Sequence, residues 1–305
     1  GAAVPMPVYV PPGRGVYVAR SFGRTPRMVE LFGRLTGQPY PWDRYAQVLA
    51  WNFGAGGMEN TSATTLYDTA VLSPTAVADG YDLDGLIAHE LAHQWFGDLI
   101  TCRSWDHIWL NEGFATYFAN LWFESRDGAD AYQAGIRGNF DSVIAGDHAD
   151  APYQRAMVSR NYREPGEMFG GPANPYPKGS SILHMLRMRL GDDVFFEGLA
   201  KYVAQYRFKD AETHDFRRVM EDTSGDSLDR FFRQWCEHPG VPDLDIAAEW
   251  DEKTSELVVT VKQTQNIDGD NPAFAFNLPI WVNEPGAASR IGRRAGAGAN
   301  KLGAV

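Results

Sequence analysis

The residues best suited to chemistry are two histidines and a glutamate in the segment 89–93, which reads HELAH. Helical positions i and i+4 lie on one face about 6 Å apart, so His89 and His93 can reach one zinc ion. Glu90 then projects beside them, where a zinc-bound water would lie. A chain of this size shows the pattern by chance roughly once in a hundred. The alternative is a structural helix whose histidines only cap it or form hydrogen bonds.

A catalytic zinc site usually takes three protein ligands, so the pattern requires a third ligand elsewhere. Glu112 can supply it, because eighteen residues separate it from His93 and the segment 109–113 (WLNEG) starts the next predicted helix. This spacing allows a turn and a short connection back to the first helix. A third histidine six positions after His93 is excluded, since Leu99 stands there and Phe96 replaces the glycine of that scheme. The sequence predicts a site of two histidines and one glutamate.

The chain resembles the zinc aminopeptidases typified by aminopeptidase N, to which leukotriene hydrolase is related (the gluzincin metallopeptidases). Four segments carry the resemblance, in the family's order and within residues 26–282: 56–60 (GGMEN), 89–97 (HELAHQWFG), 109–117 (WLNEGFATY) and 176–179 (YPKG). The resemblance implies an α+β fold. We expect a thermolysin-like zinc peptidase domain, with a small sheet and a mainly helical lobe, followed by the start of an all-β module.

The resemblance implies that His89, His93 and Glu112 bind one Zn²⁺ per chain and that Glu90 is the general base. Zinc lowers the pKa of its bound water to about 7, so Glu90 can take the proton and later pass it to the leaving amine. Tyr176 is implied to donate its phenolic hydrogen to the oxyanion of the tetrahedral intermediate. Without the resemblance, Tyr176 reads as a loop aromatic between two prolines.

The resemblance also assigns substrate binding to Gly56, Gly57, Met58, Glu59 and Asn60. Glu59 is implied to bind the free α-amine of the substrate, because a carboxylate fixed beside the zinc favours a cationic N-terminus. On local sequence alone, a solvated acid after a glycine turn is an equally good reading. The family usually has alanine at the position of Gly57, and glycine occurs there in the leukotriene-hydrolase branch.

We therefore expect a zinc-dependent aminopeptidase that hydrolyses the N-terminal bond of peptides with a free N-terminus. One alternative is an epoxide hydrolase of the leukotriene-hydrolase type. Gly57 and the segment 105–107 (WDH) resemble that branch of the family, whereas the segment 94–96 (QWF) resembles the aminopeptidase N branch more closely. The other alternative is an inactive fragment or binding protein. Inactive relatives typically lose the base or a metal ligand, and this chain has all of these residues.

Two groups of residues near the predicted ligands have predicted structural roles. Asn111 and Thr116 flank Glu112 and are candidates for hydrogen bonds that orient the metal ligands, although either can be an ordinary helix residue. Six large aromatic residues are predicted to form the core between the two zinc helices rather than a substrate surface: Trp95, Phe96, Trp109, Phe114, Tyr117 and Trp122.

Composition limits the class of partner. The 305 residues include 28 Lys and Arg against 39 Asp and Glu, a net charge of −11, which argues against a nucleic-acid partner held through its phosphates. The chain contains no long uninterrupted apolar run, so no transmembrane segment is expected in it. Two cysteines are too few for a disulfide framework. Nothing in the sequence predicts localisation, oligomeric state or side-chain preference.

Periodicity predicts the elements that must position these residues. Strands are expected at 45–53, 64–72, 244–250, 257–262 and 274–280. Helices are expected at 26–36, 83–97, 111–122, 128–145, 179–190, 193–206, 213–223 and 227–236.

Four domains or segments are predicted from these elements and the resemblance. Residues 1–25 form an irregular segment with at most one strand, the end of an N-terminal β domain that family members carry and this chain lacks. Residues 26–240 form the catalytic domain. Residues 241–283 are part of a β-sandwich module, and the Gly/Ala-rich tail 284–305 is predicted to be disordered. The chain thus reads as a catalytic-domain fragment.

Overall fold

The computed structural model describes residues 3–147, 155–269 and 271–278. The chain divides into two units, one up to Val241 and one from Pro242 onward, and each is described by itself. Among the described residues, none of the helices combines the length and the apolar character needed to cross a membrane. The predicted tail 284–305 lies outside the described residues.

The sheet of the first unit has the strand order β1-β2-β4-β3. Its strands are β1 (Val8–Tyr9), β2 (Ala46–Ala50), β3 (Gly57–Met58) and β4 (Ala63–Tyr67). The first three strands in this order are parallel, while β3 runs antiparallel to β4, with Gly57 opposite Leu66 and Met58 opposite Thr65. Because β3 is an outer strand, only one of its edges is paired within this sheet. Two further strands, β5 (Ile100–Cys102) and β6 (Lys209–Ala211), form a small parallel pair.

Helices make up most of the remainder of this unit. The α-helices are α1 (Val18–Phe22), α2 (Thr25–Leu35), α3 (Pro74–Ala78), α4 (Asp84–Ala92), α5 (Trp109–Asp127), α6 (Ala129–Asp147), α7 (Pro175–Leu190), α8 (Asp192–Tyr206), α9 (Thr213–Ser224) and α10 (Asp229–Phe232). Short 3-10 turns occupy Gly15–Tyr17, Trp105–His107, Pro165–Phe169 and Gly171–Ala173, and Arg233–Glu237 is a π-helical turn. The first unit is therefore a small sheet with a mainly helical lobe, as predicted.

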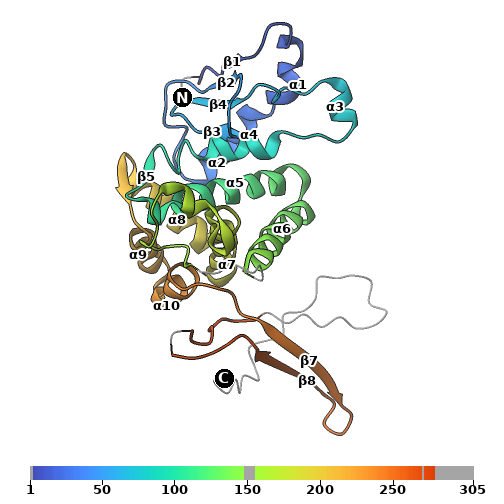
Figure 1. The fold of residues 1–305 in the computed structure, drawn as a ribbon, viewed down its shortest axis with the longest axis vertical. Coiled ribbons are helices and arrows are strands. Elements are labelled where there is room, and N and C mark those ends of the chain that lie inside the picture. Colours follow the sequence, from blue (N-terminus) through green and yellow to red (C-terminus); the bar gives the residue numbers. More distant parts are fainter. Residues whose placement is uncertain (1–2, 148–154, 270, 279–305) are drawn as a thin grey trace. The chain divides into compact units, whose positions relative to one another are not determined.

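Helices α4 and α5 lie between the sheet and the rest of the helical lobe (Figure 1). Helix α4 packs against β3 on one side and α5 on the other, and α5 in turn packs against α6 and α7. The six aromatic residues predicted as core are at most 1% exposed. The ring centroid of Phe114 lies 4.5 Å from that of Phe96 and 5.9 Å from that of Trp109, within the range of favourable aromatic pairs.

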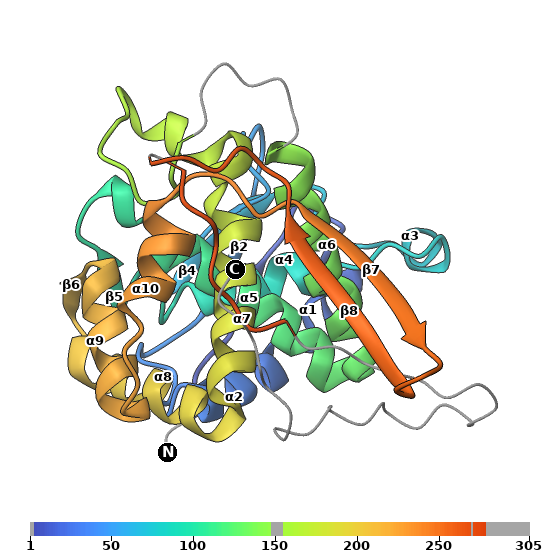
Figure 2. The ribbon, with the colours of Figure 1, turned by 90° about the horizontal axis from the view of Figure 1, so that it is seen from below.

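Helices α5 and α7 touch backbone to backbone, and both views place them side by side (Figures 1 and 2). A Cβ atom built on Gly179 would lie 2.6 Å from the Cα of Gly113, and one built on Gly113 would lie 2.7 Å from the Cα of Gly179. Only glycine fits at either position. This close approach brings the first turn of α5, with Glu112, next to the first turn of α7, with Tyr176.

The predicted helix at 26–36 is confirmed as α2. Its buried residues Met28, Leu31 and Phe32 recur at i, i+3 and i+4 and face the core. Gly37 follows with φ of 64°, a left-handed conformation that glycine adopts without the steric cost of a side chain and that ends the helix.

Several predicted boundaries are wrong. Helix α7 begins at Pro175 rather than 179, because Asn174 caps its first turn and proline is tolerated where no amide hydrogen is needed. Helix α4 ends at Ala92 rather than near Gly97, since the chain turns there and Gly97 has φ of 142°. The short helices α1 and α3 fall in regions where no helix was predicted.

The second unit contains a hairpin of β7 (Leu244–Asp251) and β8 (Glu256–Gln263), close to the predicted strands. The strand predicted at 274–280 is wrong for residues 274–278, which have no strand, and 279–280 lie outside the described residues. Instead, the side chain of Gln263 donates to the carbonyl of Phe274 (2.7 Å) and accepts from its amide (2.9 Å). One glutamine side chain thus takes the place of a strand pairing.

Candidate metal centre

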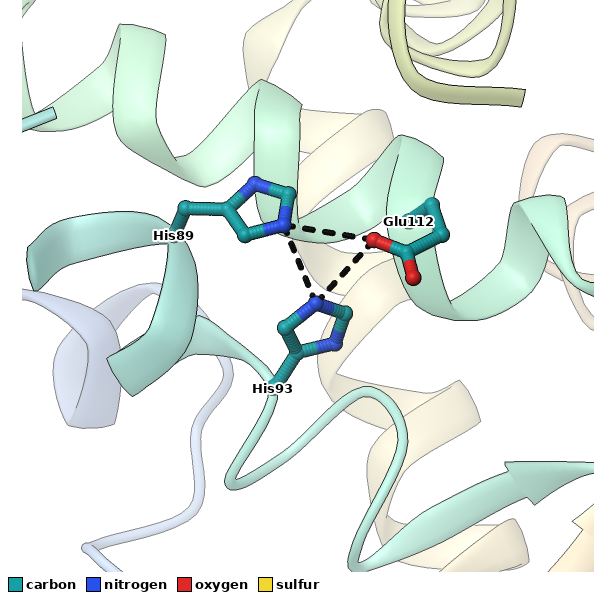
Figure 3. A group of neighbouring side chains, drawn as sticks. All are labelled: His89, His93 and Glu112. Atoms are coloured by element: carbon teal, nitrogen blue, oxygen red, sulfur yellow. Dashed lines mark hydrogen bonds and ion pairs between the residues drawn. The ribbon is translucent and has the colours of Figure 1, made fainter. Parts of the chain in front are cut away.

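The side chains of His89, His93 and Glu112 converge on one point (Figure 3). The Nε2 atoms of the two histidines are 3.1 Å apart, and each lies 3.2 Å from Oε2 of Glu112. The three atoms therefore form a nearly equilateral triangle. His89 lies in the last turn of α4, and His93 is the residue after it, still in helical conformation with φ of −57°. Glu112 lies in the first turn of α5, so the predicted i, i+4 and next-helix arrangement is present.

Hydrogen bonds at the far side of each imidazole orient the rings. Nδ1 of His93 lies 2.9 Å from the carbonyl of Phe96, which can only accept, so Nδ1 carries a hydrogen and Nε2 is the atom that can bind a metal once it is deprotonated. Nδ1 of His89 lies 3.5 Å from Oγ1 of Thr116, one of the two predicted orienting residues. The other, Asn111, instead accepts a hydrogen bond from the amide of Cys102 and ties β5 to α5.

The donor triangle fits a zinc ion. A tetrahedral zinc with bonds of about 2.0–2.2 Å holds its ligand atoms roughly 3.3–3.6 Å apart, close to the spacing found here. A second group, Glu59, Glu90 and His93, is also compact enough to hold a metal. Its nearest histidine atom is Nδ1 of His93, 3.9 Å from Glu59, and that atom donates to the Phe96 carbonyl. The first group is therefore the better metal site.

Charges within the triangle are strongly coupled. Burial alone would raise the pKa of Glu112, but hydrogen bonds from both histidines lower it to about 2. Burial would lower the pKa of His93, but the bond and the charge of Glu112 raise it to about 10, while burial keeps the pKa of His89 below its usual value. A cation that binds to this group therefore competes with protons for the histidine nitrogens.

Glu90 is buried, with 5% of its surface exposed. Its Oε2 has no hydrogen-bond partner among the described residues, and burial raises its pKa to about 8. A Cβ built on Gly57 would lie 2.3 Å from Oε1 of Glu90, so the glycine leaves the space that this carboxyl group fills. An unpaired buried carboxyl group beside a metal site suits a proton acceptor for a water molecule.

Tyr176 lies in the first turn of α7, so the interpretation as a loop aromatic is wrong. The side chain of Asn174 accepts a hydrogen bond from its amide (3.1 Å) and fixes this turn. The Tyr176 ring stacks on that of His89, with centroids 5.6 Å apart and planes 19° from parallel. Burial, followed by the charge of Glu112, raises the pKa of Tyr176, so its hydroxyl group keeps the hydrogen it would donate.

Four residues of the segment 56–60 shape the backbone around Glu59. Gly57 and Met58 form β3, and the carbonyl of Gly56 accepts from the amide of Tyr67 (3.2 Å). Asn60 accepts from Oγ1 of Thr65 (2.8 Å) and closes a turn through its carbonyl. Glu59 follows β3, and its carboxyl group lies 3.9 Å from the His93 ring. The structure thus brings Gly57 next to Glu90 and Glu59 next to His93.

An aromatic row that the sequence does not predict extends from Tyr176. The ring of Phe169 lies 6.0 Å from that of Tyr176 and 6.2 Å from that of Trp105, which is 43% exposed. Phe169 stands in a segment rich in Gly and Pro, where a single aromatic residue gives no periodic signal. Only the folded chain shows that its ring lies beside that of Tyr176.

Comparison with known proteins places this geometry in context. A model of the Peptidase family M1 domain matches residues 20–235. "Aminopeptidase 2" of Candida albicans is 31% identical over 248 residues, which cover 78% of this chain and 26% of that protein. "Tricorn protease-interacting factor F2" of Thermoplasma acidophilum is 30% identical over 259 residues, covering 84% of this chain and 32% of that protein. The chain therefore spans between 26% and 32% of the length of these relatives.

Two solved structures have folds similar to that of this chain. Aminopeptidase A of Legionella pneumophila, solved with aspartic acid, superposes with a TM-score of 0.73 at 22% identity, over 87% of this chain and 30% of that one. A mutant of the M1 zinc metallopeptidase of Deinococcus radiodurans, bound to a Tyr-Ser-Ala substrate, superposes with a TM-score of 0.60 at 28% identity. That match covers 77% of this chain and 47% of the other.

Proposed function

This chain belongs to peptidase family M1, and from that premise we propose that it is a zinc aminopeptidase domain that removes the first residue of peptides with a free N-terminus. The observation that carries the proposal is the donor triangle of His89, His93 and Glu112, with Glu90, Glu59 and Tyr176 around it.

One zinc ion per chain is held by His89, His93 and Glu112. The donor set alone also suits ferrous iron, since two imidazoles and a carboxylate bind that metal too. Zinc is favoured because the related Deinococcus radiodurans protein is described as a zinc metallopeptidase. Bound zinc supplies a Lewis acid and lowers the pKa of a coordinated water to about 7.

Glu90 is the general base and then the general acid. Burial raises its pKa, which makes the carboxylate a stronger proton acceptor than a solvent-exposed one. It takes a proton from the attacking water and delivers it to the nitrogen of the leaving amine. Oε2 is buried and has no hydrogen-bond partner among the residues that the structure describes, which leaves it available to that water.

Tyr176 donates its hydroxyl hydrogen to the oxygen that becomes negative when the carbonyl is attacked. Its fixed helical turn and its stacking on His89 hold the phenol beside the metal donors. A single donor of this kind typically contributes a few kcal/mol to transition-state stabilisation.

Glu59 binds the α-ammonium group of the substrate. Its carboxyl group is next to the metal donors, so an ammonium group bound there places the first peptide bond, and no later one, at the reacting centre. The free edge of β3 offers backbone groups to an extended substrate, which gives Gly56, Gly57, Met58 and Asn60 their role.

The epoxide-hydrolase alternative has less support. The relatives described above are named as aminopeptidases, a metallopeptidase or a protease-interacting factor. An inactive binding protein is disfavoured because the chain has all of the residues proposed as base, metal ligands and oxyanion donor.

A chelation series tests the proposal. Purified protein is assayed on aminoacyl-arylamides before and after removal of metal, after zinc is restored, and as the variant Glu90→Gln. We expect loss of hydrolysis on chelation, recovery with zinc, and a zinc-loaded Glu90→Gln protein slower by a factor of about 10²–10⁴. Undiminished hydrolysis in the metal-free protein or in the zinc-loaded variant would contradict the proposal.

A further inference from the structure

The side chain of Gln94 links the metal region to the segment that carries Glu59. It is fully buried, 0% exposed, and directly follows the predicted ligand His93. Its Nε2 donates to the backbone carbonyl of Glu59 (2.9 Å), and its Oε1 accepts from the amide of Ser62 (2.7 Å). Oε1 also accepts from the hydroxyl group of Tyr40 (3.1 Å).

These bonds support a segment that has little regular structure of its own. Strand β3 ends at Met58 and pairs with β4 at only two positions, so Glu59 is beyond the ladder. Ser62 has φ of 61°, a left-handed conformation that is costly for a residue with a side chain. Gln94 holds both ends of the turn, one at the carbonyl of Glu59 and the other at the amide of Ser62.

We infer that Gln94 is a positioning residue, which fixes Glu59 at the distance from the metal where only a terminal α-ammonium group can be bound. The inference rests on the proposed function. Because Gln94 adjoins His93 in the chain, one short turn sets both the metal ligand and the anchor for the amine. A buried amide can do this without adding charge next to Glu59 and Glu90.

Two substitutions separate its hydrogen bonds from its volume. Gln94→Glu keeps the length and the acceptor oxygen but places a second oxygen against the carbonyl of Glu59. Gln94→Met keeps the volume and removes all three bonds. Gln47→Glu is the matched control, because Gln47 is also buried, 1% exposed, but lies in β2 and donates to Thr25 (3.3 Å).

The test measures how much the α-amine contributes to ligand binding. Zinc-loaded protein is titrated calorimetrically with leucine hydroxamate and with 4-methylpentanehydroxamate, which has the same metal-binding group and side chain but no amine. We expect the amine to tighten binding about 10- to 100-fold in the unmodified protein. In Gln94→Glu and Gln94→Met this ratio should fall about tenfold, while the Kd of the amine-free ligand and the zinc content change by less than about twofold. Gln47→Glu should keep the ratio.

An unchanged ratio in folded, zinc-loaded Gln94 variants would overturn the inference. Glu59→Gln distinguishes failure of the inference from failure of the proposed function. If Glu59→Gln leaves the ratio unchanged, Glu59 does not bind the amine, and the proposed function fails at that point whatever the Gln94 variants show. Should neither Gln94 variant fold, Tyr40→Phe decides, since it removes one bond to Oε1 and leaves the amide in place. A fall in the ratio of about twofold or more then supports the inference, and an unchanged ratio overturns it.

Discussion

His89, His93 and Glu112 stand at the adjoining ends of helices α4 and α5, whereas Glu59 stands in a turn beyond a strand of two residues. Helical geometry and packing of α4 on α5 fix the first group. The second depends on side-chain hydrogen bonds from a residue 35 positions away in sequence, Gln94.

The two regions divide the proposed reaction between them. The helical region supplies the groups that break a peptide bond, and the turn supplies the group that chooses which bond is broken. Substitutions in one region should therefore change zinc content and turnover, and substitutions in the other should change only the preference for a free N-terminus.

The largest effect is expected from Glu112→Gln. Loss of one of three protein ligands should abolish tight zinc binding and lower hydrolysis of an aminoacyl-arylamide by about 10³-fold or more. Zinc per chain after gel filtration and the rate in the same sample provide the check. Full zinc occupancy in this variant would place the metal elsewhere.

Glu59→Gln should lower kcat/KM for substrates with a free amine about 10- to 100-fold and leave zinc content unchanged. The same variant should treat N-acetylated substrates as the unmodified protein does, because they lack the charge that Glu59 binds. Glu30→Gln, an exposed acid on α2, is the matched control. Loss of zinc in Glu59→Gln would mean that Glu59 also supports metal binding, which would contradict the separation of the two regions.

Gly179→Ala tests the backbone contact between α5 and α7 that brings Tyr176 to the metal donors. The added methyl group would meet the backbone of Gly113, so we expect a loss of about 1–3 kcal/mol in the free energy of unfolding. Gly138→Ala in α6 meets open space and should stabilise by up to about 1 kcal/mol. Denaturant unfolding measures both, and equal effects would show that the close approach is not needed.

Zinc affinity should depend on pH, since the pKa of His93 is raised to about 10 in the metal-free triangle. Below that pH a proton must leave before zinc binds, so affinity should fall about tenfold for each pH unit lowered, while Glu112 stays ionised. Zinc titrations between about pH 6.5 and 8.5, against a chelator of known pH dependence, measure the slope. A flat profile would mean that the triangle holds no displaceable proton.

Sequence alone could predict the metal group because its information is local. The spacing of His89 and His93 on a helix and the start of the next helix at Glu112 are both visible as periodicity. The aromatic core between α4 and α5 follows for the same reason, and the structure confirms it.

Other features depend on contacts between distant residues. The need for glycine at Gly113 and Gly179 arises only where α5 and α7 touch in the folded chain. Gln94 cannot be distinguished in the sequence from any other polar residue that follows a helix. The alternation after Phe274 predicts a strand, yet the backbone of Phe274 bonds to the side chain of Gln263. Tertiary hydrogen bonds of this kind leave no pattern along the chain.

The most direct test is a crystal structure of the zinc-loaded protein with leucine hydroxamate, with the metal located by anomalous scattering at the zinc edge. The account predicts one zinc peak within about 2.0–2.2 Å of Nε2 of His89, Nε2 of His93 and a carboxylate oxygen of Glu112. It also predicts the α-amine of the ligand within hydrogen-bond distance of Glu59. A zinc peak between Glu59, Glu90 and His93, or an amine turned away from Glu59, would contradict it.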